Sequence, residues 1–344
     1  MKTCAIEPYN KDGYNNNIFK IHFMFAKMKE ILEKHDYEVM TLDLIENLGK
    51  LDLILVFACN RDVLIRIQKI NCKKIYFAGE PEVVEPAHSR FNLAILAHFF
   101  SAVLTPFDYS VDNKRIFKFN FPNNLEQYPD NIAFDKKKLL CNVSGYKNSN
   151  NPKELYSLRR KVIDYFKNSS DFDFYGHGNW NELGYSNYKG IVNNKQELYH
   201  QYKFALSIEN ANNIKGYITE KIIDCFRSGI VPIYYGGDSK EYIPEDCYIH
   251  IEDYLDNFAA LENLLKSMSE KEWSDYVKRG NAYLCNQGNE LYSLNTFERN
   301  FEHLLDEGLI TMRSIETSGV GVKLLMRLIA VKQKILARVN FLFN

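Results

Sequence analysis

The sequence predicts an α/β protein built from two doubly wound domains, each a parallel sheet with helices on both faces. Short apolar runs alternate with amphipathic stretches along most of the chain. Alternation of strands and helices in this way builds parallel sheets that are covered on both sides. The length of 344 residues exceeds what one compact domain usually holds, and a polar interruption lies near residue 130. Two domains in tandem are therefore expected.

The first half of the chain contains three short apolar runs that are typical of buried strands, at 51–58, 74–78 and 101–105. Amphipathic patterns at 18–34 and 61–70 predict helices that precede and separate these strands.

The second half repeats the same pattern. Expected strands alternate with expected helices, the strands at 139–145, 171–176, 204–210 and 231–237 and the helices at 153–167 and 219–229. From 255 to about 309 the pattern is helical only.

A domain boundary is expected within 120–138, where prolines, asparagines and a charged run interrupt the periodicity. We accordingly predict a first domain at 1–135, a second domain at 136–310 and a tail at 311–344. In sheets of this kind, ligands bind beyond the carboxyl ends of the strands, and two facing domains form a cleft.

Composition excludes several classes of protein. Lys and Arg number 43 against 44 Asp and Glu, so the basic excess of a nucleic-acid-binding protein is missing. With 46% hydrophobic residues, the chain has ample material for a core. The seven cysteines are scattered without a C-x-x-C pair, which favours buried thiols in a reducing compartment. No signal peptide and no apolar run of 18 residues is recognisable, so a cytoplasmic protein is expected.

The densest group of unusual residues lies between 202 and 236. An expected strand ends at Glu209, and an expected helix begins near Thr219. A helix amino terminus has free N–H groups and a positive dipole end, so it can bind an anion. Lys221 adds a charge that suits a diphosphate, and the carboxylate of Glu220 can accept hydrogen bonds from sugar hydroxyls. The alternative is that Glu220 only stabilises the helix dipole and that Lys221 is solvated.

This segment resembles the donor-binding segment of glycosyltransferase family 10, the α-1,3/1,4-fucosyltransferases. The chain has FALSIEN at 204–210, GYITEK at 216–221 and VPIYYG at 231–236, where the family has F-x-x-x-F-E-N, Y-[VI]-T-E-K and V-P-[IV]-x-x-G. Ile208 replaces the second Phe. The resemblance implies a GT-B-type fold with two facing Rossmann-like domains and GDP-fucose as the donor. It also implies donor contacts from Asn210, Tyr217, Glu220 and Lys221.

The segment 139–178 is similar to the strand, helix and strand that precede this site in the family. By resemblance, an arginine of the helix contacts the donor diphosphate. Arg159 fits the spacing best, and Arg160 is the alternative. The planar guanidinium group of arginine suits bidentate recognition of phosphate.

A third similarity lies in the first half, where IYFAGEPE at 75–82 resembles a Y-x-G-E turn of bacterial fucosyltransferases. The resemblance makes Glu80 the general base, with Glu82 and Glu85 as alternatives. Transfer with inversion requires a carboxylate that takes the proton of the acceptor hydroxyl as the hydroxyl attacks the anomeric carbon. No second carboxylic acid is required, because the nucleotide diphosphate leaves as a stabilised anion.

No metal and no cofactor besides the donor substrate is expected. Asp171-Phe172-Asp173 matches the D-x-D motif that binds manganese in other glycosyltransferases. Alternation of polar and apolar residues in a half-buried strand explains the same spacing without a metal. The glycine-rich motifs of dehydrogenases and P-loop proteins do not occur.

The tail carries basic residues among apolar ones from 317 to 344, with no acidic residue after Glu316. A basic amphipathic helix of this kind can lie on an anionic membrane surface, as a peripheral attachment at the inner face of the cell membrane. Some bacterial fucosyltransferases end in a similar segment. The alternative is a helix that packs on the protein itself or on a second subunit in a homodimer.

Together these patterns predict an inverting fucosyltransferase that moves L-fucose from GDP-β-L-fucose to a glycan hydroxyl, which the family implies is the 3-hydroxyl of N-acetylglucosamine. The product would be an α-linkage in a Lewis-type glycan. A transferase of the same architecture with another nucleotide sugar, or a nucleotide- or carbohydrate-binding protein without turnover, remains the alternative.

Overall fold

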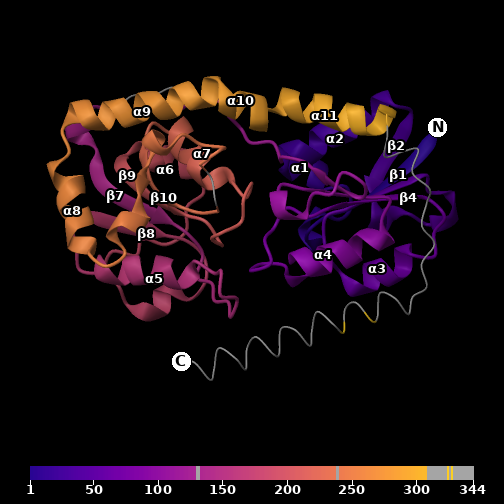
Figure 1. Cartoon of the computed structure of the whole chain (residues 1–344), viewed down its shortest axis with the longest axis horizontal. Coiled ribbons are helices and arrows are strands. Elements are labelled where there is room, and N and C mark those ends of the chain that lie inside the picture. Colours follow the sequence, from indigo (N-terminus) through magenta and orange to yellow (C-terminus); the bar gives the residue numbers. More distant parts are fainter. Residues whose placement is uncertain (129–131, 238–239, 308–323, 325–326, 328–344) are drawn as a thin grey trace. The chain divides into compact units, whose positions relative to one another are not determined.

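The computed structural model describes residues 1–128, 132–237 and 240–307, together with Leu324 and Arg327 (Figure 1). The chain divides into two compact units. Unit 1 comprises Met1–Pro122 and the described residues from Leu294 onward, and unit 2 comprises Asn123–Ser293. Both units have the doubly wound α/β architecture that the sequence predicts.

The division differs from the predicted domains in two places. The boundary follows Pro122 instead of residue 135, because the segment after it is bonded to unit 2. The backbone N–H of Asn123 donates to the carbonyl oxygen of Tyr292 at 2.8 Å, and that of Tyr128 to Arg227 at 2.8 Å. The last described helix, α11 (Leu294–Glu307), belongs to unit 1 and not to the second domain.

Unit 1 is built on a six-stranded sheet in which every pair of neighbours is parallel. The order of its strands is β2-β1-β3-β4-β5-β6. The strands are β1 (Lys2–Glu7), β2 (Tyr37–Thr41), β3 (Leu53–Val56), β4 (Lys73–Phe77), β5 (Ala102–Thr105) and β6 (Ile116–Lys118).

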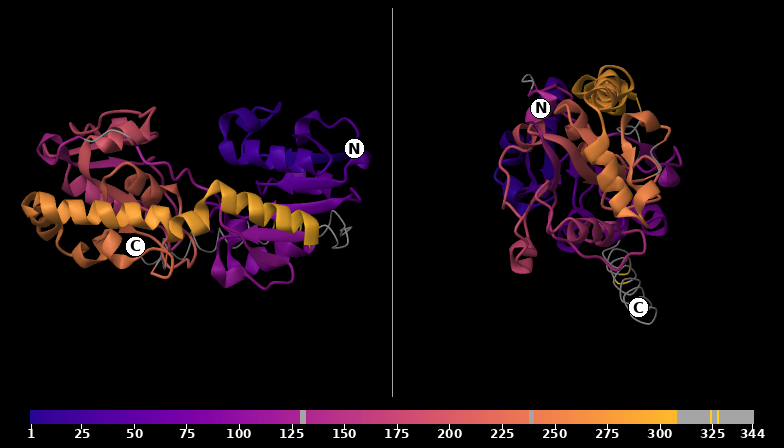
Figure 2. Two further views of the ribbon diagram at one scale, coloured as in Figure 1. Left: turned by 90° about the horizontal axis from the view of Figure 1, so that it is seen from above. Right: turned by 90° about the vertical axis from the view of Figure 1, so that its left-hand side faces the viewer.

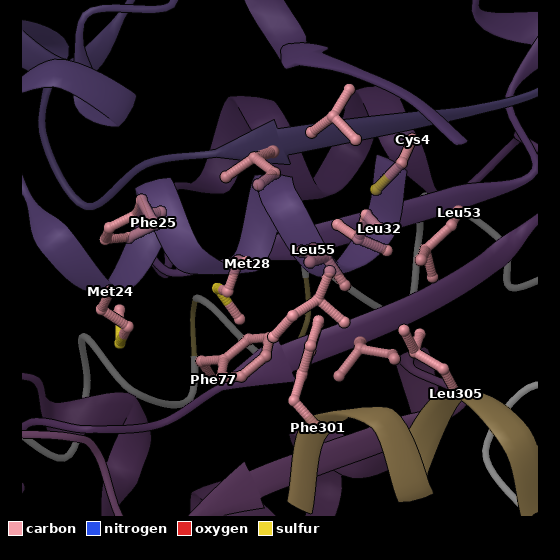
Figure 3. Close-up of a cluster of buried hydrophobic side chains, with 14 of the residues drawn as sticks. Cys4, Met24, Phe25, Met28, Leu32, Leu53, Leu55, Phe77, Phe301 and Leu305 are labelled. Atoms are coloured by element: carbon pink, nitrogen blue, oxygen red, sulfur yellow. The ribbon is translucent and has the colours of Figure 1, made fainter. Parts of the chain in front are cut away.

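Helices cover both faces of the unit 1 sheet (Figure 1). Besides α11, these helices are α1 (Ile18–Ile21), α2 (Phe23–Lys34), α3 (Arg61–Ile67) and α4 (Arg90–Leu96). Alternate side chains of each strand point to opposite faces. Leu53 and Leu55 thus join Phe77 in a core with α2, and Figure 3 shows Phe301 and Leu305 of α11 in that core. Figure 2 shows α11 running along unit 1, where it packs beside α2.

Unit 2 has a parallel sheet of five strands in the order β11-β10-β9-β7-β8. The strands are β7 (Lys138–Val143), β8 (Phe172–Tyr175), β9 (Tyr202–Ile208), β10 (Val231–Tyr235) and β11 (Ile249–His250). From β7 the chain winds outward to β8, and from β9 it winds the other way to β10. The winding therefore reverses between the neighbours β7 and β9, which is where doubly wound sheets bind ligands.

The helices of unit 2 also lie on both faces of its sheet. α5 and α8 pack on the face that holds Phe204 and Leu206, and α6 and α7 pack on the other face. α9 contributes side chains to the clusters on both faces. The helices are α5 (Tyr156–Tyr165), α6 (Lys195–His200), α7 (Glu220–Arg227), α8 (Phe258–Ser267), α9 (Glu270–Cys285) and α10 (Gln287–Tyr292).

All the predicted strands are present within two or three residues of their expected bounds, and the chain from 258 to 307 is helical, as predicted. The helix expected at 18–34 is divided into α1 and α2, because His22 has an extended backbone with φ −138° and ψ 114°.

The predicted tail at 311–344 lies outside the described residues, apart from Leu324 and Arg327, which are exposed. Within the described part of the chain, no helix combines the length and the apolar character needed to cross a bilayer.

Candidate active site

The candidate donor site lies at the carboxyl ends of β7, β9 and β10 in unit 2. Parallel strands end at one edge of a sheet, so the loops that follow them meet there. Glu209 and Asn210 follow β9, Thr219 precedes α7, and Gly236 follows β10. The three sequence blocks that the resemblance rests on thus come together at the point where the winding reverses.

The centre of this site is the side chain of Glu209, which has no exposed surface. Its Oε1 accepts hydrogen bonds from the backbone N–H of Thr219 at 3.0 Å and from the Thr219 hydroxyl at 2.8 Å. Its Oε2 lies 2.9 Å from Nζ of Lys221. Burial of a carboxylate is costly unless it is paired and hydrogen-bonded, and here both conditions are met. Glu209 stands in the sequence motif but was not among the predicted site residues.

The amino terminus of α7 is oriented by this carboxylate. Thr219 is the N-cap residue, and its hydroxyl accepts from the backbone N–H of Lys221 at 3.3 Å and from Nζ of Lys221 at 2.9 Å. Although burial opposes its charge, Glu209 and Glu220 raise the pKa of Lys221, so the ammonium group stays protonated. A fixed positive charge at a helix amino terminus is an arrangement that binds anions.

Glu220 lies on the open side of the same turn, with 59% of its side chain exposed. Its carboxylate is 3.8 Å from Nζ of Lys221. The charge of Lys221, reinforced by that of Lys195, holds the pKa of Glu220 well below its usual range. Glu220 is therefore an ionised acceptor of hydrogen bonds at the exposed edge of the buried network.

Asn210 and Tyr217 are paired with each other inside the loop between β9 and α7. Nδ2 of Asn210 donates to the hydroxyl oxygen of Tyr217 at 3.2 Å, and both side chains are buried. The contact closes the loop, so it joins two of the predicted donor-binding residues in one structural unit.

Two glycines allow β10 to approach this loop. A Cβ atom on Gly237 would lie 2.1 Å from the carbonyl oxygen of Ile214, and one on Gly236 would lie 2.8 Å from Cγ of Glu209. Both distances are shorter than any normal contact. In the sequence, the pair of glycines after VPIYY is the feature that indicates this close approach between the end of β10 and the loop after β9.

Arg159 lies beside the network, and Arg160 lies apart from it. Nη2 of Arg159 donates to the carbonyl oxygens of Ile208 at 2.6 Å and Glu209 at 3.1 Å. Its buried Nε has no hydrogen-bond partner among the described residues. Burial lowers the pKa of the Arg159 guanidinium group. The group remains charged, because the ordinary pKa of arginine is very high. Arg160 instead donates from Nη1 to the carbonyl oxygen of Lys147.

The predicted base, Glu80, belongs to unit 1, where it follows β4 in an exposed position. Glu82 and Glu85 were the alternatives for the base, and the side chain of Glu85 stabilises the local fold. Its Oε1 accepts from the backbone N–H of Ala87 at 3.1 Å and caps the short helix Pro86–His88. Glu82 is half-buried in the same loop.

The D-x-D aspartates lie at the opposite, amino-terminal edge of the unit 2 sheet, at the start of β8. Asp171 pairs with Lys266 at 3.1 Å. Asp173 pairs with Lys138 at 3.1 Å and accepts from the Tyr202 hydroxyl at 2.7 Å. In the described ranges, no three His, Cys, Asp or Glu side chains are grouped as metal ligands.

Comparison with known proteins agrees with this geometry. Residues 134–290 match the profile of "Glycosyltransferase family 10 (fucosyltransferase) C-term". The Alpha-(1,3)-fucosyltransferase FucT of Helicobacter pylori is 42% identical over 110 residues, which are 30% of this chain and 19% of that protein. The human 4-galactosyl-N-acetylglucosaminide 3-alpha-L-fucosyltransferase 9 is 30% identical over 168 residues, 48% of this chain and 39% of that enzyme.

A solved α1,3-fucosyltransferase with GDP superimposes with a TM-score of 0.56 at 16% identity, over 91% of this chain and 92% of that one. The sequence matches cover well under half the length of the two curated relatives, so they establish the relationship for the matched segment.

The fold is thus of the GT-B type, two doubly wound units with parallel sheets. Within it, residues 134–290 match the glycosyltransferase family 10 profile, in agreement with the resemblance of the motifs at 204–236.

Proposed function

We propose that the chain is an α-1,3-fucosyltransferase that transfers L-fucose from GDP-β-L-fucose to a glycan hydroxyl with inversion at the anomeric carbon. The observation that carries this proposal is the network of Glu209, Thr219 and Lys221 at the reversal point of a family 10 domain. The fucosyltransferase names of the curated relatives support the same activity.

The donor diphosphate is assigned to the amino terminus of α7. Lys221 supplies a protonated ammonium group there, and the first turn of the helix adds backbone N–H groups. Arg159 is a further cation close to this site, and its buried Nε, which has no hydrogen-bond partner in the part of the chain that the structure describes, is an available donor. Glu220, whose carboxylate is exposed, is assigned to hydroxyl groups of the donor. Asn210 and Tyr217 hold the loop that these groups stand on.

The chemical step needs one base. In the proposed reaction Glu80 takes the proton of the acceptor hydroxyl, while the hydroxyl oxygen forms a bond to the anomeric carbon of fucose. The bond from that carbon to the β-phosphate oxygen breaks, and its electron pair leaves with GDP. Lys221 and Arg159 stabilise the negative charge that develops on the leaving diphosphate.

The 3-hydroxyl of N-acetylglucosamine in a Lewis-type glycan is the proposed acceptor. The name of the human relative specifies a 4-galactosyl-N-acetylglucosaminide as its substrate, which supports this choice. Transfer is proposed to need no metal ion, because cationic side chains stand where a metal would otherwise neutralise the diphosphate. A cytoplasmic location is proposed, with the basic segment 317–344 attaching the enzyme to an anionic membrane surface.

Transfer itself is the test. Purified full-length protein is incubated with GDP-fucose, N-acetyllactosamine and EDTA, and the product is identified by mass spectrometry and by NMR of the new linkage. An α-1,3-linked fucose is expected on N-acetylglucosamine, and the Glu80→Gln variant should form none while it still binds GDP. Transfer from another nucleotide sugar, or restoration of activity only by manganese, would contradict the proposal.

A further inference from the structure

The loop that presents Glu80 is held from behind by a buried histidine. His88 is 3% exposed and ends the short helix Pro86–His88. Its Nδ1 lies 2.5 Å from the backbone carbonyl oxygen of Glu80, and its Nε2 lies 2.7 Å from the hydroxyl oxygen of Tyr76. The ring therefore connects the backbone of Glu80 to strand β4, on which Tyr76 lies.

The direction of these hydrogen bonds follows from their partners. A carbonyl oxygen can only accept, so Nδ1 of His88 carries the proton and donates to Glu80. Burial lowers the pKa of His88 to about 4, so the ring is neutral at physiological pH. Nε2 then has a lone pair and accepts from the Tyr76 hydroxyl. Each ring nitrogen has one partner of the right kind.

Other contacts fix both ends of the loop. At its start, the backbone N–H of Ala78 donates to Leu104 at 2.8 Å, and the hydroxyl of Thr105 donates to the carbonyl oxygen of Ala78 at 3.0 Å. At its end, the hydroxyl of Tyr109 donates to the carbonyl oxygen of His88 at 3.1 Å. Between these anchors, Glu80 is the exposed residue whose carbonyl group is bonded to His88.

We propose that His88 is a positioning residue for Glu80, holding the backbone of the general base through its Nδ1–H so that the carboxylate stays in place for proton removal. The proposal rests on the function proposed above. A general base must lie within hydrogen-bond reach of the proton it takes. A displacement of about 1 Å can cost about 100-fold in rate.

Substitution of His88 by asparagine or by glutamine allows its two hydrogen bonds to be tested one at a time. In His88→Asn, the amide nitrogen stands near the position of Nδ1 and can still donate to the carbonyl oxygen of Glu80. In His88→Gln, the amide reaches the position of Nε2 and can accept from Tyr76, but the Glu80 carbonyl loses its donor. Tyr76→Phe keeps the donor to the Glu80 carbonyl and removes the hydroxyl that contacts His88 and Cys59, so it is the matched control.

The experiment measures kcat, the KM for each substrate, the melting temperature and hydrogen exchange of the backbone amides at 80–85 in the full-length protein. His88→Gln is expected to lower kcat by about 100-fold with an unchanged KM for GDP-fucose, and to speed exchange in the loop. His88→Asn and Tyr76→Phe should lose less than about tenfold at a similar melting temperature.

Equal losses in His88→Asn and His88→Gln, or loop exchange that is the same in both, would overturn the positioning role. Failure of the proposed function gives a different result. The wild-type protein would then transfer no fucose, or Glu80→Gln would keep the full rate, while the exchange measurement would still decide whether His88 anchors the loop.

Discussion

The ammonium group of Lys221 lies 2.9 Å from Oε2 of Glu209, a carboxylate without exposed surface. The same carboxylate binds the backbone N–H and the hydroxyl of Thr219. One buried negative charge thus fixes the first turn of α7 and the cation that stands in it. This pairing gives the candidate site its geometry before any ligand binds.

Replacing Glu209 should therefore unfold the site, whereas replacing its exposed neighbour in the motif should not. Glu209→Ala leaves Thr219 and Lys221 without their buried partner, and breaking a buried pair costs about 3–5 kcal/mol. Glu220→Ala is the control, since an exposed ion pair such as that of Glu220 with Lys221 contributes about 1 kcal/mol or less. Urea unfolding of the two variants measures the difference. Equal stabilities would show that the buried network contributes little.

Substitutions of the two neighbouring arginines, Arg159 and Arg160, should have different effects on the affinity for GDP. Arg159→Lys cannot reproduce the guanidinium contacts with both carbonyl oxygens, so GDP affinity is expected to fall by about tenfold or more. Arg160→Lys changes a side chain that is bonded to the loop at Lys147, and GDP affinity should stay within about twofold. Isothermal titration calorimetry measures both. The opposite ranking would assign the diphosphate to Arg160.

Helix α11 should be essential for the stability of unit 1, although it follows unit 2 in the sequence. Phe301 has no exposed surface and packs with residues of α2 and the unit 1 sheet (Figure 3). Phe301→Ala should lower the free energy of unfolding by about 3–5 kcal/mol. Asn300→Ala, on the exposed side of the same helix, should change it by about 0.5 kcal/mol or less. A small loss at Phe301 would mean that α11 is dispensable for the core.

The pH dependence of stability tests the structural role of Asp173. Burial alone would raise the pKa of this carboxyl, but Tyr202 and Lys138 bring it below its usual value of 3.8. The folded-state pKa lies below the unfolded one, so the stabilisation is complete above about pH 5 and disappears as the pH falls through the folded-state pKa.

The difference in unfolding free energy between the wild type and Asp173→Asn should accordingly be constant from pH 5 to pH 8 and shrink below about pH 4. Thermal unfolding with EDTA and with manganese, at each pH, is the measurement. Stabilisation of the wild type by manganese, lost in Asp173→Asn, would support the D-x-D metal site in place of the ion pair.

Strand β1, which lies inside the unit 1 sheet, was not predicted from the sequence. The sequence did predict the fold class, strands β3 to β5 and β7 to β10, and the segment that builds the donor site. These features depend on local apolar runs and on residues close together along the chain, such as FALSIEN and GYITEK. Glu209 stood within that motif, yet its central role was missed. Its importance depends on burial and on the distances to Thr219 and Lys221, which a linear motif does not contain.

Two other features could not be read from local patterns. α11 returns to unit 1 because the apolar face with Phe301 and Leu305 completes the core around α2, and this contact joins residues more than 250 positions apart. The contact between His88 and the Glu80 carbonyl likewise depends on the fold of the loop. His88 directly precedes Ser89, the N-cap residue of α4, and no sequence motif at this position indicates a bond to the Glu80 carbonyl.

The most direct test of the donor site is thermal stabilisation by nucleotides in the presence of EDTA. A ligand that binds only the folded state raises its melting temperature by mass action. GDP should stabilise the wild-type protein, UDP, CMP and ADP should have little effect, and the GDP shift should largely disappear in Lys221→Ala. A shift with UDP in place of GDP, or a GDP shift that persists in Lys221→Ala, would contradict the assignment of the diphosphate to the amino terminus of α7.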